Sequence, residues 1–207
     1  MSDETLPDNT IQPRQRLLET ALVEFADNGF DATSVRDICK KAGMNIASVN
    51  YYFRDKEALY IEAVRHAHTC STRPLPEVPP GMPPREQLVQ FIRLMALQMH
   101  APASPASMKL MMREMAHPGK AGHVIVNEFI RPMAFHLRDT IRAMFPEMPE
   151  SRRLMIGFSI FGQLLFYRQN RPVAELIFSR EEVEALTVEM VTEHVTNFTL
   201  RALGVER

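Results

Sequence analysis

Cysteine, glycine, tryptophan and long apolar runs are the scarce features of this 207-residue sequence, which has two cysteines, eight glycines and no tryptophan. Cys39 and Cys70 form no CxxC pair, so neither a disulfide framework nor a zinc site is predicted. We expect Cys39 to be a small buried residue and Cys70 a free thiol near a helix end, with a redox sensor as the alternative. Because no eighteen-residue apolar run and no N-terminal h-region is present, we expect a cytoplasmic protein.

Sequence motifs of catalysis are also missing. The chain has no G-x-S-x-G, no Gly-rich phosphate loop and no triad pattern. Its seven histidines are scattered, and the one close pair, His66-x-His68, faces two ways on a helix. No enzyme, metal site or cofactor is therefore predicted.

Most of the chain shows the periodicity of α-helices. Apolar residues recur every three to four positions, no segment of note has the period of a strand, and an all-α fold is predicted. Six of the fifteen prolines lie between positions 71 and 84, which predicts an extended connector between domains at 1–70 and 85–207. Beyond residue 84, helices are expected at 85–100, 105–116, 121–145 with a kink near Pro132, 150–169 and 180–203, with a turn at 172–178.

The stretch from Thr33 to Lys56 reads as two short helices joined by a tight turn. Ser34 and Asp37 have the spacing of a capping box, and Gly43 supplies the left-handed residue that ends the first helix. Asn45 can cap the second helix. A helix-turn-helix unit is predicted, whose second helix can lie in a DNA major groove. An ordinary corner between packed helices is the alternative interpretation.

The outward side chains of the second helix suit DNA. Ala47 and Ser48 are small and allow close approach. Asn50 can make a bidentate contact to adenine or bond a phosphate, and the hydroxyls of Tyr51 and Tyr52 can reach phosphate oxygens.

Further residues of the N-terminal part complete a recognisable pattern. They are Leu17-Leu18-x-x-Ala21-Leu22-x-x-Phe25, Asn28-Gly29-Phe30, Thr33-Ser34-Val35-Arg36-Asp37-Ile38, Ala42-Gly43 and Tyr51-Tyr52-Phe53-x-x-Lys56-Glu57-x-Leu59. With them, the chain from about Ile11 to Ala63 resembles the DNA-binding domain of the TetR family of transcriptional regulators. Asn50 stands where that family often has Tyr, so its base preference is not carried over. The resemblance implies a DNA-binding face made by Ser34, Val35, Arg36, Ile46, Ala47, Ser48, Asn50, Tyr51, Tyr52 and Lys56.

Charge sets a condition on this interpretation. The net charge is −1, and eight Lys or Arg stand against eight Asp or Glu from Pro13 to His66. DNA-binding domains are usually basic, so positive potential has to be local and specificity has to come from paired half-sites. The candidate sources are Arg36, Lys40, Lys41, Arg54 and Lys56.

Methionine is abundant in the second half. Eight of the fourteen methionines lie between positions 82 and 133, where TetR-like regulators hold their effector pocket. Methionine is flexible and polarisable and suits varied apolar ligands, although core filling is the alternative. We hypothesise a pocket for an apolar or aromatic small molecule. Its lining is expected to include Met95, Met99, Met111, Met112, Met115, Phe129, Met133 and Phe161.

Two segments sharpen the resemblance. Arg113-Glu114-Met115-x-His117-Pro118, followed by Glu128-Phe129-Ile130-x-Pro132, is similar to the CecR-type branch, whose members respond to antimicrobial compounds. Arg113 and Glu114 either pair structurally or meet a polar group of the ligand.

The helices at 150–169 and 180–203 are long and apolar, and the first is apolar on more than one face. In TetR-like proteins the corresponding pair forms a four-helix bundle with its two-fold mate. A homodimer is therefore predicted, with a central core helix as the alternative for 150–169.

Together these features predict a two-domain, homodimeric repressor released from a palindromic DNA operator by an apolar or aromatic effector. The alternatives are a TetR-like DNA binder without a small-molecule effector and a helical ligand-binding protein that does not act on DNA.

Overall fold

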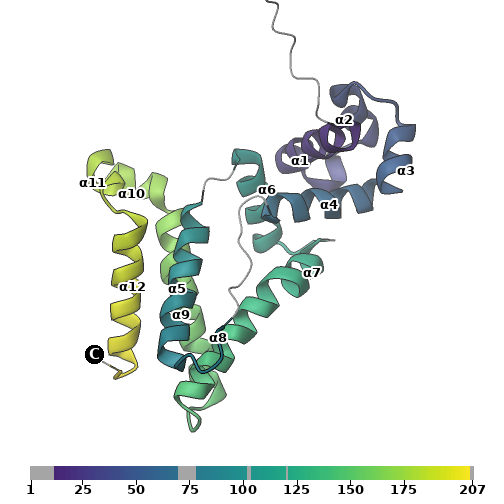
Figure 1. Cartoon of the computed structure of the whole chain (residues 1–207). Helices are drawn as coiled ribbons and strands as arrows, with labels where there is room; N and C mark the ends of the chain where they lie inside the picture. The colour runs from purple at the N-terminus through teal and green to yellow at the C-terminus, as the bar shows by residue number, and fades with distance from the viewer. Residues whose placement is uncertain (1–11, 70–77, 102–103, 120, 206–207) are drawn as a thin grey trace, which may run out of the picture. The chain divides into compact units, whose positions relative to one another are not determined.

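The computed structural model describes residues 12–69, 78–101, 104–119 and 121–205, and all regular structure in these ranges is helical (Figure 1). The all-α prediction is confirmed. Cys70 and most of the predicted connector lie outside the described residues. The helices are α1 (Pro13–Ala32), α2 (Val35–Ala42), α3 (Ala47–Phe53), α4 (Lys56–Thr69), α5 (Pro84–His100), α6 (Pro105–Ala116), α7 (Gly122–Ile125), the π-helix η1 (Val126–Ile130), α8 (Arg131–Met144), α9 (Glu150–Gln169), α10 (Arg171–Ile177), α11 (Arg180–Glu184) and α12 (Val188–Ala202).

Packing divides the chain into two compact units. The first contains residues 1–70 and 103–128, and the second contains residues 71–102 and 129–207. Helices α6 and α7 therefore pack with the N-terminal helices α1 and α4. The predicted division into a DNA-binding domain, a connector and an effector domain concerns function and stays a prediction.

Helix α1 supplies much of the core of the first unit, as its periodicity predicts. Leu17, Ala21 and Phe25 are fully buried, and the Phe25 ring meets the Tyr60 ring of α4 edge-on at 4.8 Å. Helix α1 is kinked at Gly29 (φ 79°, ψ 176°), after which helical turns resume and continue to Ala32.

Replacing Gly29 with Ala should lower the free energy of unfolding by about 1–3 kcal/mol. The backbone of Gly29, at φ 79° and ψ 176°, lies in a region essentially restricted to glycine that costs an L-residue about 1–3 kcal/mol, and a Cβ there would lie 2.6 Å from Nη1 of Arg113. Urea unfolding measures the loss. Gly81→Ala is the matched control, because Gly81 has φ +80° and a Cβ added there would meet no atom within 4 Å. If the two variants lost equal amounts of unfolding free energy, contact between the new Cβ and the Arg113 guanidinium would contribute nothing to the loss.

Helix α6 is fastened to the first unit by buried and exposed polar contacts. The Tyr60 hydroxyl donates to the Glu114 carboxylate, which is 4% exposed and also accepts the Gly119 N–H at 3.1 Å. At the surface, Lys109 Nζ lies 2.8 Å from the Asp27 carboxylate. Arg113 Nη1 donates to the Phe25 carbonyl at 3.4 Å. In the structure, Arg113 and Glu114 thus bond to partners on or near α1 and α4.

The predicted kink near Pro132 is observed as a change of helix type. The expected helix over 121–145 consists of α7, the π-helical turn η1 and α8. Pro132 has no N–H to donate to the carbonyl four residues earlier, and its fixed φ suits the first turn of a new helix. Pro132 accordingly lies in the first turn of α8.

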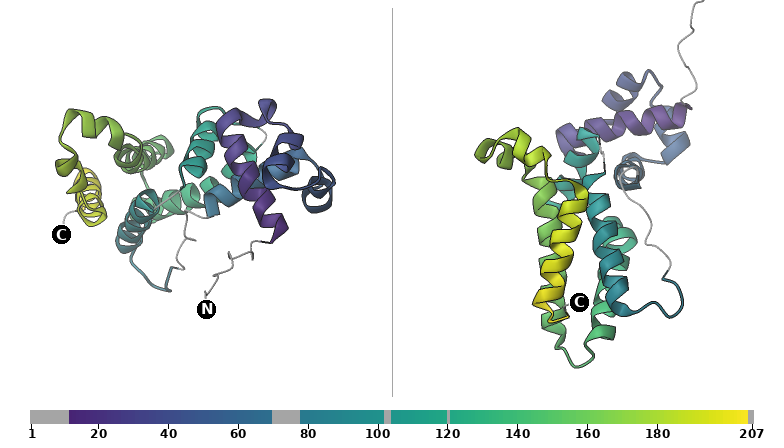
Figure 2. Two further views of the ribbon diagram at one scale, coloured as in Figure 1. Left: turned by 90° about the horizontal axis from the view of Figure 1, so that it is seen from above. Right: turned by 60° about the vertical axis from the view of Figure 1, so that its left-hand side comes forward.

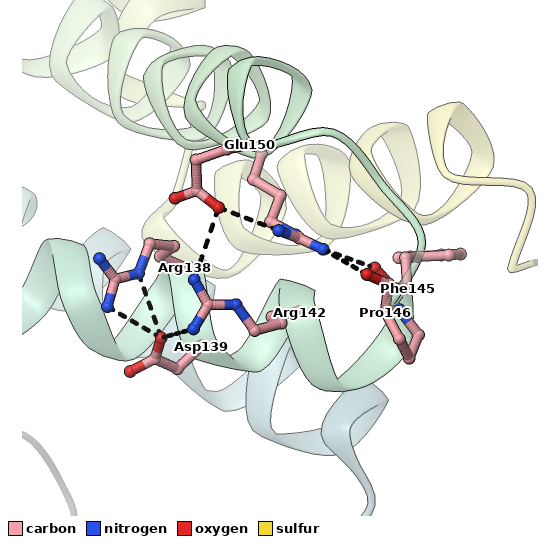
Figure 3. Close-up of polar contacts among 7 residues, drawn as sticks. Arg138, Asp139, Arg142, Phe145, Pro146 and Glu150 are labelled. Atoms are coloured by element: carbon pink, nitrogen blue, oxygen red, sulfur yellow. Dashed lines mark hydrogen bonds and ion pairs between the residues drawn. The ribbon is translucent and has the colours of Figure 1, made fainter.

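The second unit packs α5, α8, α9 and α12 around one apolar core. Helix α9 begins and ends where the periodicity predicts. Arg153 fixes its start by donating to Glu150 at 2.9 Å and to the Phe145 and Pro146 carbonyls at 3.2 and 2.7 Å. Figure 3 shows these acceptors beside the charged chain formed by Arg138, Asp139, Arg142 and Glu150. The α8–α9 turn is thereby held by side chains from both helices.

The C-terminal prediction was wrong in two details. The expected turn at 172–178 is the helix α10, and the expected helix over 180–203 is broken between α11 and α12. Capping explains the break. The Thr187 hydroxyl accepts the Met190 N–H at 3.3 Å and starts α12, while Ser179 and Glu182 form a capping box that starts α11. No helix in the described part of the chain is long and apolar enough to cross a membrane.

Candidate nucleic-acid interface

The two-helix unit predicted between Thr33 and Lys56 is present, and short-range hydrogen bonds fix its shape. The Ser34 hydroxyl accepts the Asp37 N–H at 3.1 Å and donates to the Asp37 carboxylate at 2.6 Å. Gly43 is left-handed at φ 66° and ψ 36°, and its N–H donates to the Lys40 carbonyl. The Asn45 side chain accepts the Ala47 N–H at 2.9 Å and starts α3. The caps read from the sequence therefore set the angle between α2 and α3.

Helix α3 turns one face to the core and one to solvent. Val49 and Phe53 are buried, while Tyr51 is 82% exposed and its ring meets the Tyr52 ring edge-on. The predicted DNA-binding residues divide into two groups by exposure. Ser34, Arg36, Ile46, Ala47, Asn50 and Tyr51 are exposed, and Val35, Ser48, Tyr52 and Lys56 are partly buried. Their contact with DNA stays a prediction.

Fewer of the positively charged side chains on this surface are free of ion pairs than the sequence indicates. Lys41 pairs with Glu24, whose hydrogen bond raises the Lys41 pKa, and Arg54 pairs with Asp55 at 2.9 Å. Within the described ranges, Arg36 and Lys40 form no ion pair and both are exposed. Lys40 is therefore a candidate phosphate contact, as Arg36 is, although the sequence indicated it only as a source of positive potential.

Lys56 is held at the start of α4. Its ammonium lies 4.4 Å from the centre of the Phe30 ring and donates to the Asp31 carbonyl at 3.4 Å. Asp55 caps the same helix by accepting the Ala58 N–H at 2.8 Å. These contacts fix a cation where the helix dipole alone would disfavour it.

Replacing Lys56 with Ala should weaken binding to all DNA sequences about equally. Loss of one phosphate contact should lower the slope of log K against log salt by about one for each bound domain. Fluorescence anisotropy across a salt series measures this slope. Lys109→Ala is the control, because Lys109 lies on α6 and pairs with Asp27. An unchanged slope for Lys56→Ala would remove Lys56 from the interface.

The predicted effector residues fall in both units. Met95 is buried in the core of the second unit, and Met99, Met133 and Phe161 pack against that core. Phe161 meets Phe91 edge-on at 5.9 Å. Met111, Met112 and Met115 lie on α6 in the first unit, and Phe129 begins the second unit's part of η1. Four of the eight residues are thus gathered around one core, and the pocket itself stays a prediction.

Large apolar side chains are also exposed to solvent on α9 and on α12. Phe158 is 74% exposed and Phe166 63% on α9, and Phe198 is 55% exposed on α12. An open surface hollow lies along α12. It is lined by Met190, Glu193, His194, Asn197, Phe198, Arg201 and Ala202. Across the described ranges, no cluster of three or more His, Cys, Asp or Glu could hold a metal ion.

A helix-turn-helix unit with an exposed second helix, joined to a helical unit with its own core, is an arrangement typical of DNA-binding regulators. Two family models match the chain. Residues 17–63 match bacterial regulatory proteins of the TetR family, and residues 84–203 match the C-terminal domain of the HTH-type transcriptional dual regulator CecR. The chain belongs to the TetR family of transcriptional regulators and carries a CecR-type C-terminal domain, as both resemblances indicate.

Individual relatives agree with this assignment. CecR of Shigella flexneri is 26% identical over 202 residues, which cover 89% of this chain and 90% of that protein. The repressor KstR2 of Mycolicibacterium smegmatis is 42% identical over 62 residues, which cover 28% of this chain and 30% of that protein.

Solved structures show the same fold. A mutant of HlyIIR matches with a TM-score of 0.60 at 17% identity, over 90% of this chain and 96% of that chain. A TetR-like regulator from Rhodococcus sp. RHA1 matches with a TM-score of 0.58 at 18% identity, over 94% and 97%.

Proposed function

We propose that this TetR-family DNA-binding regulator is a homodimeric, cytoplasmic repressor that an apolar or aromatic small molecule releases from a palindromic operator. The observation that carries the proposal is the exposed face of α3, held by caps on α2 and α3 and joined in one chain to a CecR-type domain. The proposed division places DNA binding in residues 1–70 and effector binding with dimerisation in residues 85–207.

Two features of the second unit support the finer parts of the proposal. The apolar face of α9 and α12 is the surface through which a second copy would pair, and two half-sites then add their binding free energies. Met95, Met99, Met133 and Phe161 lie around one core and offer an adaptable apolar site. No catalytic activity is proposed.

Within the first unit, α4 is the element through which a change can reach the DNA face. Arg65 of α4 donates to both carboxylate oxygens of Glu128 at 2.9 and 2.6 Å and holds the pKa of Glu128 below its usual range. Glu128 is the last residue of the first unit, so the chain enters the second unit directly after this clamp. Lys56 lies at the other end of α4. We propose that effector binding displaces η1 and that the Arg65–Glu128 pair transmits the displacement along α4.

Release of the operator by compounds tests the proposal. Apolar aromatic compounds are first screened by thermal shift, and hits are titrated into the protein bound to fluorescent DNA from upstream of its own gene. To lower occupancy from 99% to 1%, a compound needs about 5.5 kcal/mol of preference for the DNA-free form. Hits that raise the melting temperature without changing DNA binding would contradict the effector mechanism. Because the CecR relative is named a dual regulator, transcription is measured in both directions.

A further inference from the structure

The segment from α10 to α11, which we call the arm, exposes large apolar side chains. Val173 is 52% exposed, Leu176 87%, Ile177 70% and Phe178 59%. In both views of Figure 2 the arm extends away from the helices that form the core of the second unit. Exposed apolar residues gathered in this way mark an interaction site on a folded protein.

Ion pairs and a helix cap stabilise the structure of the arm. Arg171 pairs with Glu175 at 3.0 Å within α10, and it also lies 3.8 Å from the Glu184 carboxylate, which ties α10 to α11. Arg180 also pairs with Glu184, at 2.8 Å, and the Ser179 capping box starts α11. The ion pairs hold the apolar side chains in place before any partner arrives, which lowers the entropic cost of binding.

Charge decides which class of partner fits. From position 171 to position 184 the arm has two arginines and four glutamates, so it carries a net charge of −2. The arginines are engaged with glutamates of the same arm. DNA phosphates and anionic lipid headgroups are repelled by such a surface. The partner is therefore a protein with an apolar surface and some positive charge.

A second copy of this chain offers such a surface. The exposed apolar residues Phe158 and Phe166 of α9 and Val173 and Ile177 of α10 lie on consecutive helices, so apolar side chains are exposed on both sides of the cap residue Asn170. On α12, the surface lined by Met190 and Phe198 also holds Glu193 and Arg201, and the Arg201 guanidinium is the cation that a glutamate of the arm can meet. No ion pair is formed by Arg201 within the described ranges.

We propose that the arm packs on the α9–α12 face of a second copy and extends the homodimer interface beyond the bundle. This inference rests on the homodimer of the proposed function. In a two-fold dimer each arm contact occurs twice, so one substitution in the arm alters two contacts per dimer.

Sedimentation equilibrium of the full-length protein tests the inference. The double variant Leu176→Ser with Ile177→Ser should raise the dimer dissociation constant at least tenfold, with an unchanged circular dichroism spectrum. Val23→Ser is the matched control, because Val23 is 45% exposed on α1 in the first unit. Arg201→Glu should weaken the dimer in the same direction as the arm variant.

The outcomes separate the inference from the proposed function. A wild-type protein that stays monomeric at all concentrations overturns the homodimer and the inference together. If the wild-type protein is a dimer and the arm variant has the same dimer dissociation constant, the inference alone is overturned. Photo-crosslinking from p-benzoylphenylalanine at position 176 gives an answer even if the double variant does not fold. A covalent dimer supports the inference, and a dimeric protein that yields no intermolecular product contradicts it.

Discussion

Replacing Phe158 with Asp should leave the protein monomeric and lower its affinity for operator DNA at least a hundredfold. Phe158 is 74% exposed on α9, beside Leu154 and Met155, which are 50% and 60% exposed. In a dimer through this face the new carboxylate would be buried without a partner, at a cost of several kcal/mol per copy. A two-fold interface contains the substitution twice. Because a monomer reads one half-site, loss of the dimer carries over to DNA binding.

The effect is measured by sedimentation equilibrium together with fluorescence anisotropy on the operator. Phe135→Asp is the matched control, because Phe135 is 47% exposed on α8 and its ring is covered by the Arg138 guanidinium at 4.3 Å. The control should stay dimeric and bind DNA normally. A dimeric Phe158→Asp variant would show that the α9 face is not the interface.

Replacing Tyr60 with Phe should lower the free energy of unfolding by about 1.5–3 kcal/mol, the range for losing a hydrogen bond to a charged group. Tyr60 is 1% exposed and Glu114 4% exposed, so water does not readily replace the lost donor. Of the two donors to the Glu114 carboxylate, the Gly119 N–H remains. Urea unfolding measures the change, with Tyr51→Phe as the control because Tyr51 is 82% exposed.

The same contact predicts a pH dependence. Burial raises the pKa of Tyr60 well above its usual range, and the hydrogen bond to Glu114 raises it further. An unfolded tyrosine loses its proton near pH 10, at a pH where folded Tyr60 keeps it. The unfolded state therefore binds fewer protons, and stability falls as pH rises above about 10. Tyr60→Phe should lack this part of the alkaline loss. Identical alkaline slopes in the two proteins would contradict the assignment.

Features set by short-range chemistry were predictable from the sequence. Ser34, Gly43 and Asn45 each act within four residues of their own position, and each caps or ends a helix as predicted. The bounds of α9 followed from an unbroken apolar period between Pro149 and Asn170. These signals also oriented α3, so its buried and exposed faces could be assigned.

Features set by contacts between distant residues were not predictable. Tyr60 and Glu114 are 54 positions apart, and no periodicity shows that α6 packs with α1 and α4. Lys56 lies over Phe30, a contact between two elements that the charge count could not show. The break before α12 was missed because a continuing apolar period outweighed the capping signal of Thr187.

Footprinting of the DNA upstream of the protein's own gene tests the DNA-binding role of α3 most directly. The account predicts salt-sensitive protection of two half-sites on one face of the duplex, with centres about 34 Å apart. Asn50→Ala, at the exposed face of α3, should change which bases are preferred within each half-site while the spacing stays the same. The role assigned to this face would be contradicted if no protection were seen. It would also be contradicted if Asn50→Ala preferred the same bases as the wild-type protein.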